Sequence, residues 1–349
     1  MSADVFAAPR LAARGATDFV LTLRRRWADT LYPALRAQWQ AHEGTPDTIA
    51  EEVHSLPLYP WFAWLERGSQ KLLWRAVADQ VRAEGEAAST TSTAPARLEL
   101  DPDLVLPSWY TEWDIHLQPG GVWRDRSAAA VYERGAQLVM LGDNDDYKFH
   151  RLFTQTALPA HEIGSVVDLG CGFGKSTWPL QQRFANAQVT GIDLAAPCLE
   201  LAAHRAGKLG LPITFRQADV CATGLPDGSV DLITSTMLLH ELPLSTLPAL
   251  FAECARLLRP RGTVRFLDFH LTGDSFRDLA MLEHSARNNE PYLAPLLHSD
   301  ITMIARKAGL ANVRWTAFDE RGDGRLQGLE WPARSEWHFP WAVLEAERA

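Results

Sequence analysis

The amino-acid sequence predicts an α/β fold, in which a doubly wound, mostly parallel sheet of seven strands over residues 151–349 follows an α-helical region over residues 1–150. Two observations predict it. Short apolar runs alternate with helical patterns between about residues 160 and 270, as expected for successive βαβ units. The first run also ends in a turn containing Gly170, Gly172 and Gly174, where the chain can bend sharply and a ligand can approach the bare backbone.

A helix is expected to begin at about Lys175, directly after this glycine turn. The first N–H groups of a helix have no partners within it, so they would point at a ligand lying beside the strand ends. Such a loop is typical of sites for nucleotide-like ligands.

The first 150 residues carry a different, helical pattern. Apolar residues recur at helical spacing over 17–40, with Pro33 as a kink or break, and again over 60–83. Two more helices are expected at 127–141 and 143–156, and a polar linker at 84–97. Eight tryptophans precede the sheet region, and we expect those on helices to build a small core. This region is predicted to cap a substrate site or to form a homodimer.

Composition excludes several partners. A formal net charge of -9 argues against nucleic acid, because phosphate binding needs clustered Lys and Arg. No apolar run approaches the ~20 residues of a membrane span, and no signal peptide follows Arg24-Arg25-Arg26. The four cysteines have no C-x-x-C spacing, which suits a reducing compartment. A cytoplasmic protein is expected, with neither membrane nor nucleic-acid partners.

The spacing of the glycine turn distinguishes between cofactors. A nicotinamide-binding turn reads G-x-G-x-x-G and would place its third glycine at Lys175, whereas here that glycine is Gly174. Asp168 stands two positions before Gly170, which completes a D-x-G-x-G-x-G pattern. This pattern resembles the first motif of the class I, Rossmann-like S-adenosylmethionine-dependent methyltransferases.

Further motifs follow in the order that the resemblance requires. A second strand, 187–192, ends at Asp193, which is placed to accept the ribose hydroxyls. A third strand at 213–216 leads to Asp219 and Val220, which the resemblance assigns to the adenine. A fourth strand spans 229–235. Residues 257–264 resemble the family's LLRPGG turn, with Arg261 replacing its first glycine.

The resemblance covers roughly residues 160–270 and implies S-adenosylmethionine as cosubstrate, with Asp168 serving its ammonium group. The residues expected to bind it are Asp168, Gly170, Cys171, Gly172, Gly174, Asp193, Leu194, Asp219, Val220 and Thr236. Strands at 313–318 and 339–345 are expected to form an antiparallel hairpin at the edge of the sheet.

The segment after the fourth strand is expected to face the methyl group, and it contains His240 and Glu241. Methyl transfer from a sulfonium needs an aligned acceptor and, where that acceptor carries a proton, a base. We assign catalysis to these two residues, with His240 as the base. The alternative, equally weighted, is that His240 only packs or hydrogen-bonds at the strand end.

Two other segments are candidates for substrate contacts. Residues 107–123 combine Trp109, Trp113, His116 and Gln118 with a Gly-Gly turn, although a purely structural turn fits as well. An insertion at about 271–298 follows the fifth strand. Its expected substrate residues are His284, Asn288 and Asn289, which would equally suit a solvated loop with a helix cap at Asn289.

A metal site is considered and not favoured. Two histidines and a carboxylate suit a divalent transition metal, and the sequence offers His240, Glu241, His270, His284 and His298 near predicted strand ends. These residues lie on separate segments without a local ligand spacing, so no metal is predicted.

The leading function is methyl transfer to a small metabolite or natural product. A protein acceptor is the first alternative, and a non-catalytic cofactor-binding protein is the second. A nucleic-acid acceptor is disfavoured because residues 235–238 read Ser-Thr-Met-Leu instead of the [DNS]-P-P-[YF] segment of amino-methylases.

Overall fold

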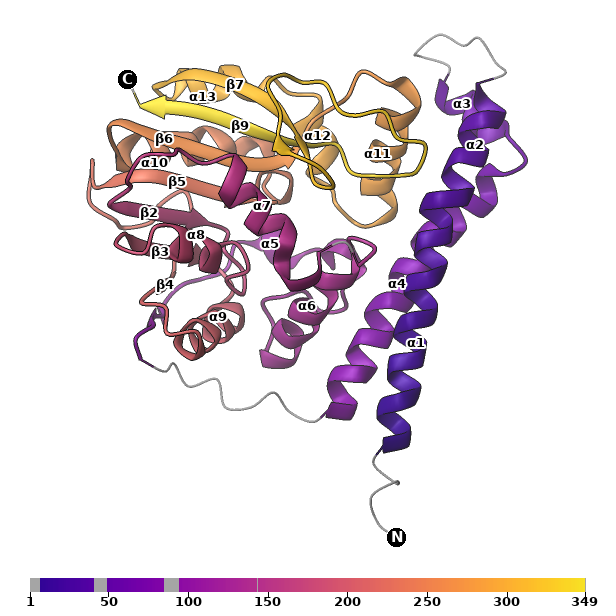
Figure 1. Cartoon of the computed structure of the whole chain (residues 1–349), viewed down its shortest axis with the longest axis horizontal. Helices are drawn as coiled ribbons and strands as arrows, with labels where there is room; N and C mark the ends of the chain where they lie inside the picture. The colour runs from indigo at the N-terminus through magenta and orange to yellow at the C-terminus, as the bar shows by residue number, and fades with distance from the viewer. Residues whose placement is uncertain (1–6, 41–48, 85–93, 143, 349) are drawn as a thin grey trace.

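The computed structural model describes residues 7–40, 49–84, 94–142 and 144–348. Within these ranges the chain forms an α/β structure around one mixed sheet of nine strands, in the order β1-β4-β3-β2-β5-β6-β9-β7-β8 (Figure 1). The strands are β1 Arg97–Glu99, β2 Ser165–Leu169, β3 Gln188–Asp193, β4 Thr214–Gln217, β5 Val230–Thr236, β6 Leu258–Phe269, β7 Leu310–Asp319, β8 Gly324–Arg325 and β9 Trp341–Arg348.

The sequence predicted seven strands, and the sheet of the described residues has nine. The additional strands are the short β1 and β8, at opposite edges of the sheet. β1 comes from the region expected to be helical and pairs in parallel with β4, which places Arg97 opposite Thr214. Three- and two-residue strands leave almost no periodic signal in a sequence, so only their pairing identifies them.

The predicted βαβ order is confirmed. Helices α8 Thr177–Arg183, α9 Ala196–Lys208 and α10 Leu247–Leu257 separate strands that pair in parallel. β2 lies between β3 and β5, so the order of strands reverses beside it. Ligands of open α/β sheets bind outside the carboxyl ends of the strands at such a point.

The C-terminal strands β7 and β9 pair antiparallel as expected, and only the two-residue β8 lies beyond them at this end of the sheet. β9 is antiparallel to β7 and also to β6, so it lies inside the sheet. Its residues 341–346 are all buried, which a strand with partners on both sides and helices on both faces requires.

Two hydrophobic cores lie on the two faces of the sheet. One contains residues of α10 and of α13 Ile301–Lys307. The other joins α7 Lys148–Thr156, α8 and α9 to the N-terminal helices in a single cluster. The N-terminal region therefore shares its core with the sheet.

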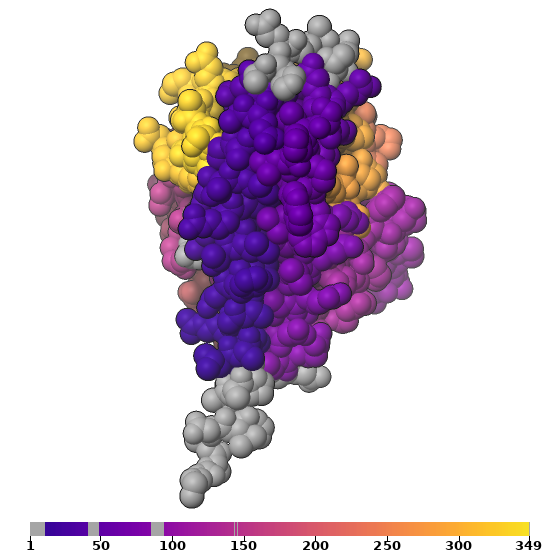
Figure 2. Space-filling view, turned by 90° about the vertical axis from the view of Figure 1, so that its right-hand side faces the viewer, coloured from indigo at the N-terminus to yellow at the C-terminus, as the bar shows by residue number. Residues whose placement is uncertain are grey.

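The N-terminal region is built around α1 Ala7–Arg26 and α4 Tyr59–Glu84, which pack side by side. They stand next to the sheet and cover one side of the molecule (Figures 1 and 2). The remaining elements of this half are η1 Trp27–Leu31, α2 Tyr32–Trp39, α3 Ile49–Ser55, α5 Ser108–Thr111, η2 Ile115–Leu117, α6 Arg126–Leu138 and η3 Asp145–Tyr147.

The expected break at Pro33 takes the form of a five-residue π-helical turn, η1, directly before the helix that carries this proline. The expected polar linker lies mainly outside the described residues. Its last residue, Arg97, begins β1.

The expected tryptophan core is found only in part. Trp27 and Trp74 are buried, whereas Trp61 and Trp64 are 65% and 66% exposed on α4. Among the described helices, none is both long enough and apolar enough to cross a lipid bilayer.

Candidate active site

A cavity of about 210 Å³ lies at the carboxyl ends of the central strands. Its walls come from the glycine turn, from the ends of β3, β5 and β6, and from α4 and residues 109–123 of the N-terminal region. Segments far apart in the sequence thus meet around one space. The remaining elements near it are η4 Leu239–Glu241, η5 Leu244–Thr246, α11 Ser275–Arg287 and α12 Leu293–Leu297.

The glycine turn borders the cavity through Gly170 and Gly172, both with left-handed backbone. A Cβ atom on Gly170 would lie 2.8 Å from Leu238, which shows how closely the turn passes the segment after β5. α8 begins at Thr177, two residues later than predicted, so Lys175 still belongs to the turn.

Asp193 ends β3 and holds the turn in place. Its Oδ2 accepts the Gly172 N–H at 2.8 Å and its Oδ1 accepts the Ala195 N–H at 2.8 Å. Burial raises the pKa of Asp193, although these donors and Lys175 favour the charged form. Each carboxylate oxygen can accept further hydrogen bonds, so the side chain remains able to bind hydroxyl groups in the cavity.

Asp168 does not line the cavity. It is fully buried, and its oxygens accept hydrogen bonds from Ser176, Thr177 and Thr234 at 2.6, 2.7 and 3.0 Å. Burial raises the pKa of Asp168 to about 6, because the three hydroxyls only partly replace water. The carboxylate therefore ties the glycine turn to β5.

The other predicted cofactor residues divide into two groups. Leu194, Asp219 and Val220 line the cavity together with Gly170, Gly172 and Asp193. Cys171, Gly174 and Thr236 are buried and do not line the cavity. Gly174 is needed for packing, because a Cβ atom there would lie 2.8 Å from the Trp178 indole nitrogen.

His240 and Glu241 lie in η4, on the side of the cavity formed by the segment after β5. The Nδ1 atom of His240 is 2.7 Å from Oδ1 of the buried Asp268 at the end of β6. Its Nε2 atom is 3.4 Å from Glu241 Oε1. Burial alone would lower the pKa of His240, but Asp268 and Glu241 raise it well above its usual value.

His116 approaches the same carboxylate from the N-terminal region. Its Nε2 atom is 2.9 Å from Glu241 Oε1, and its Nδ1 atom is 2.8 Å from Oε1 of the buried Glu290. Burial disfavours the imidazolium, yet the two carboxylates raise the pKa of His116 to about 10. The same interactions hold the pKa of Glu241 well below its usual range, although burial alone would raise it.

The backbone at His116 is strained. His116 and Leu117 have consecutive positive φ angles of 56° and 61°, a conformation that L-residues with side chains adopt at a cost of about 1–3 kcal/mol each. Two donors from α4 hold it, since the Trp74 indole N–H and the Gln70 amide bond the His116 carbonyl at 2.6 and 3.1 Å.

Replacing Trp74 by phenylalanine is expected to lower the free energy of unfolding by about 1–2 kcal/mol, because a buried hydrogen bond and part of a packed ring are lost. Urea unfolding followed by circular dichroism measures it. Trp64→Phe on the same helix is the control, expected to change stability by less than about 0.5 kcal/mol because Trp64 is exposed. An equal loss of unfolding free energy in the two variants would contradict the role of Trp74 in holding the His116 backbone.

The predicted substrate residues are only partly brought together. Trp109, Trp113, His116, Gln118 and His284 line the cavity. Asn288 is buried behind His284, to whose backbone carbonyl its amide donates at 2.9 Å. Asn289 has a φ of +58° after the end of α11, where it terminates that helix instead of capping the next one.

The four histidines considered as metal ligands do not all lie at one site. His270 bonds the Leu271 carbonyl and His298 bonds the Ala294 carbonyl, and neither lines the cavity. Glu290 belongs to the insertion that the sequence assigns to substrate contacts, but the sequence predicts no contact of either Glu290 or Asp268 with a histidine. A glutamate just past the end of a helix and an aspartate within a buried strand carry no local signal that each contacts a histidine.

Lys175 is a further cavity residue that the sequence did not identify. Its Nζ atom lies 3.2 Å from the Tyr132 hydroxyl and 5.0 Å from the centre of that ring. Burial lowers the pKa of Lys175 to about 8, although Glu241, Asp168 and Asp193 oppose this. The signal available was its position, one residue after the last glycine of the turn.

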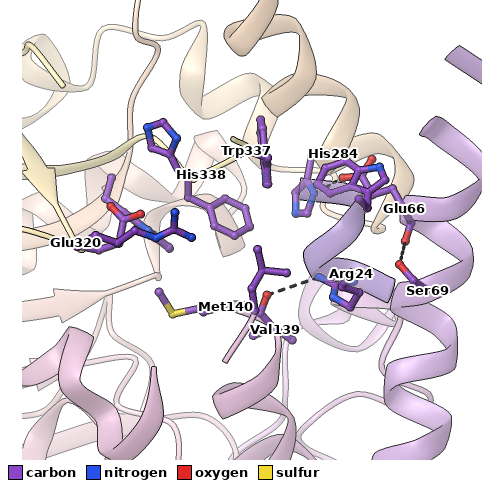
Figure 3. A pocket seen from close by; sticks show the side chains of 14 residues that line it. Arg24, Glu66, Ser69, Val139, Met140, His284, Glu320, Trp337 and His338 are labelled. Atoms are coloured by element: carbon purple, nitrogen blue, oxygen red, sulfur yellow. Dashed lines mark hydrogen bonds and ion pairs between the residues drawn. The ribbon is translucent and has the colours of Figure 1, made fainter. Parts of the chain in front are cut away.

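A smaller cavity of about 30 Å³ adjoins the large one and shares Arg24, Met140 and His284 with it (Figure 3). There His284 Nδ1 lies 2.6 Å from a carboxylate oxygen of Glu66 on α4, and Arg287 pairs with the same carboxylate. Figure 3 shows Glu66, Ser69 and Arg24 on the N-terminal helices facing this space.

Comparison with known proteins supports the motif assignment. Residues 166–262 match the family model described as a methyltransferase domain. Nocamycin O-methyltransferase of Saccharothrix syringae is 37% identical over 101 residues, covering 28% of this chain and 35% of that protein. A trans-aconitate 2-methyltransferase of Deinococcus radiodurans is 39% identical over 111 residues, covering 32% and 40%. The chain thus spans less than half the length of these curated relatives.

Among solved structures, phosphoethanolamine N-methyltransferase 2 of Haemonchus contortus, in complex with S-adenosylhomocysteine, has a TM-score of 0.42 and 16% identity. The superposition covers 62% of this chain and 59% of that chain. A TehB-like methyltransferase of Corynebacterium glutamicum has a TM-score of 0.43 and 18% identity, with 64% and 100% covered.

Proposed function

Because this chain carries a class I S-adenosylmethionine-dependent methyltransferase domain, we propose that the protein methylates a small molecule held in the 210 Å³ cavity. One observation carries the proposal. The motif residues Gly170, Asp193 and Asp219 line the same cavity as the polar groups His116, His240 and Glu241. Cofactor and acceptor could therefore meet in one space.

The cofactor is assigned to the part of the cavity nearest the glycine turn. Asp193 would accept the ribose hydroxyls, and Asp219 with the Val220 backbone would contact the adenine. The methionine end would then lie along Gly170 and Gly172, where the Lys175 ammonium can meet its carboxylate.

The acceptor is assigned to the opposite part of the cavity, beside His116, His240 and Glu241. In the transfer, a lone pair of the acceptor atom forms a bond to the methyl carbon. The carbon–sulfur bond breaks with its electron pair remaining on sulfur, which leaves S-adenosylhomocysteine. A proton on the acceptor atom must also depart, and the polar cluster lies where it could orient that atom and favour its deprotonation.

The N-terminal region is proposed as a substrate cap. Gln70 and Trp74 of α4 and Arg24 of α1 line the cavity, and α4 also holds the strained backbone of His116. A cavity closed by these helices favours a small acceptor over a protein side chain. Trp61 and Trp64 are exposed on α4, and we propose self-association through them as a second role of this region.

The direct test is formation of S-adenosylhomocysteine. The protein is incubated with S-adenosylmethionine and panels of phenols, carboxylic acids, thiols and amines, and the product is quantified by mass spectrometry. Acceptor-dependent product is expected for one chemical class. The non-catalytic alternative would be favoured if the protein binds S-adenosylhomocysteine tightly in calorimetry but forms no product with any acceptor of the panels or with a protein extract.

Lys175→Met is expected to weaken binding of S-adenosylhomocysteine about 10- to 100-fold near pH 7, because a charge-assisted hydrogen bond is lost. Only the charged Lys175 ammonium attracts the ligand's carboxylate. Because the pKa of Lys175 in the protein without ligand is about 8, wild-type affinity should fall as the pH rises through this value. Calorimetry at pH 7, 8 and 9 on the two proteins measures the difference.

The ligand's own amino group titrates in both proteins, so the difference between them reports Lys175. The exposed Lys148→Met variant is the matched control and should behave as wild type. A Lys175→Met protein that keeps the wild-type pH dependence would disprove the contact.

A further inference from the structure

We propose that His116, His240 and Glu241 form a binding site for a divalent first-row transition metal at the acceptor side of the cavity. The proposal rests on the proposed function and specifies its chemistry. It replaces the predicted base role of His240 with that of a metal ligand, and it departs from the prediction that no metal is used.

The geometry of the three ligand atoms carries the proposal. One ligand atom each from His116, His240 and Glu241 lies within 4.8 Å of the other two. Oε1 of Glu241 is 2.9 Å from Nε2 of His116 and 3.4 Å from Nε2 of His240. A metal with ligand bonds of about 2.0–2.2 Å separates neighbouring ligands by roughly 3–4 Å. The three atoms need only small side-chain rotations to meet one ion.

The far side of each imidazole supplies a second, independent observation. Nδ1 of His240 is bonded by the buried Asp268 and Nδ1 of His116 by the buried Glu290. Histidines that bind metals usually donate their other N–H to a carboxylate or carbonyl, which fixes the ring and directs the free nitrogen at the ion. Here both rings are fixed in that way, with both Nε2 atoms turned to Glu241.

The charge and the donor set narrow the choice of ion. Three carboxylates, those of Glu241, Asp268 and Glu290, contact the two imidazoles. With both imidazoles neutral, as metal ligands must be, a divalent cation offsets the excess of negative charge. Two imidazoles and one carboxylate suit Zn²⁺, Fe²⁺ or Co²⁺ better than Mg²⁺ or Ca²⁺, which prefer oxygen ligands. No thiol is involved, since the described cysteines are not among the cavity residues.

Three protein ligands leave coordination positions open toward the cavity. An acceptor hydroxyl bound there would lose its proton to solvent more readily, because the cation stabilises the resulting oxygen anion. The substrate class that fits is a small molecule with a hydroxyl, methylated on oxygen. Its oxygen lone pair would attack the methyl carbon as the carbon–sulfur bond breaks toward sulfur.

Metal binding is tested without any acceptor. The full-length protein, freed of metals by a chelator, is titrated with Co²⁺ while its visible absorption bands are recorded, and then with Zn²⁺ in competition. We expect one Co²⁺ per chain in a site of nitrogen and oxygen ligands, displaced by Zn²⁺. His116→Ala, His240→Ala and Glu241→Gln should each remove this binding, and Glu290→Gln should weaken it about 10- to 100-fold.

His298→Ala is the matched control, because His298 is exposed and lies outside the cavity, and it should bind Co²⁺ as wild type does. Binding of S-adenosylhomocysteine, measured on every variant, shows that the fold persists. Wild-type protein that binds this ligand but takes up no more Co²⁺ than His116→Ala overturns the metal site and leaves the proposed function standing. Absorption bands of a thiolate ligand would overturn it as well, since they would place the ion on a cysteine.

Discussion

Replacing His240 by glutamine is expected to lower the rate of methyl transfer by about 100- to 10,000-fold, the range found when assistance to removal of the acceptor proton is lost, because the proposed metal that gives this assistance would lose a ligand. The imidazole is buried, fixed by Asp268 at 2.7 Å, and faces the acceptor part of the cavity. The rate is measured as S-adenosylhomocysteine formed per chain at saturating acceptor. Affinity for S-adenosylhomocysteine itself should change less than about threefold.

The exposed variant His298→Gln serves as the control for this experiment and should keep wild-type turnover. Full turnover of His240→Gln on the true acceptor would show that the side chain only packs at the end of β5. A parallel loss of cofactor affinity would instead place His240 against the cofactor.

Replacing Asp193 by alanine is expected to weaken binding of S-adenosylhomocysteine about 10- to 100-fold, because the ribose hydroxyls lose their acceptor, a loss of about 1–3 kcal/mol. The Gly172 N–H also loses its partner, which loosens the turn that the ligand contacts. Calorimetry measures the affinity, and thermal unfolding confirms that the protein remains folded.

Asp227→Ala is the control for Asp193, since the Asp227 side chain is 81% exposed and should not influence the ligand. Asp193→Asn keeps an acceptor oxygen and should show a smaller loss than alanine. An unchanged dissociation constant for Asp193→Ala would show that the end of β3 does not hold the ribose.

The sequence predicts the central part of the fold because its signals there are local. An apolar run, an acidic residue and a glycine turn follow one another within nine residues from Val166, and the structure places β2 and the turn there. The position of β9 is different. Its apolar pattern predicts a strand, but only pairing with both β6 and β7 shows that it lies inside the sheet.

The residues of the candidate site were predicted only in part, because contacts between distant segments leave no local signal in the sequence. Asp168 has the motif position of a cofactor residue, yet three hydroxyls occupy its carboxylate, which no spacing reveals. His116 and Glu241 stand 125 positions apart in the sequence, and their contact follows from how α4 docks on the sheet. The residue types indicate which chemistry each position can perform, but only the tertiary structure shows which side chains contact one another.

The bonds from Gln70 and Trp74 to the His116 carbonyl tie the docking of α4 to ligand binding. A group bound by His116 favours the docked helix, and by thermodynamic reciprocity the docked helix favours that group by the same factor. Truncating or loosening the α1–α4 helix pair would therefore reduce affinity for the acceptor while sparing affinity for the cofactor.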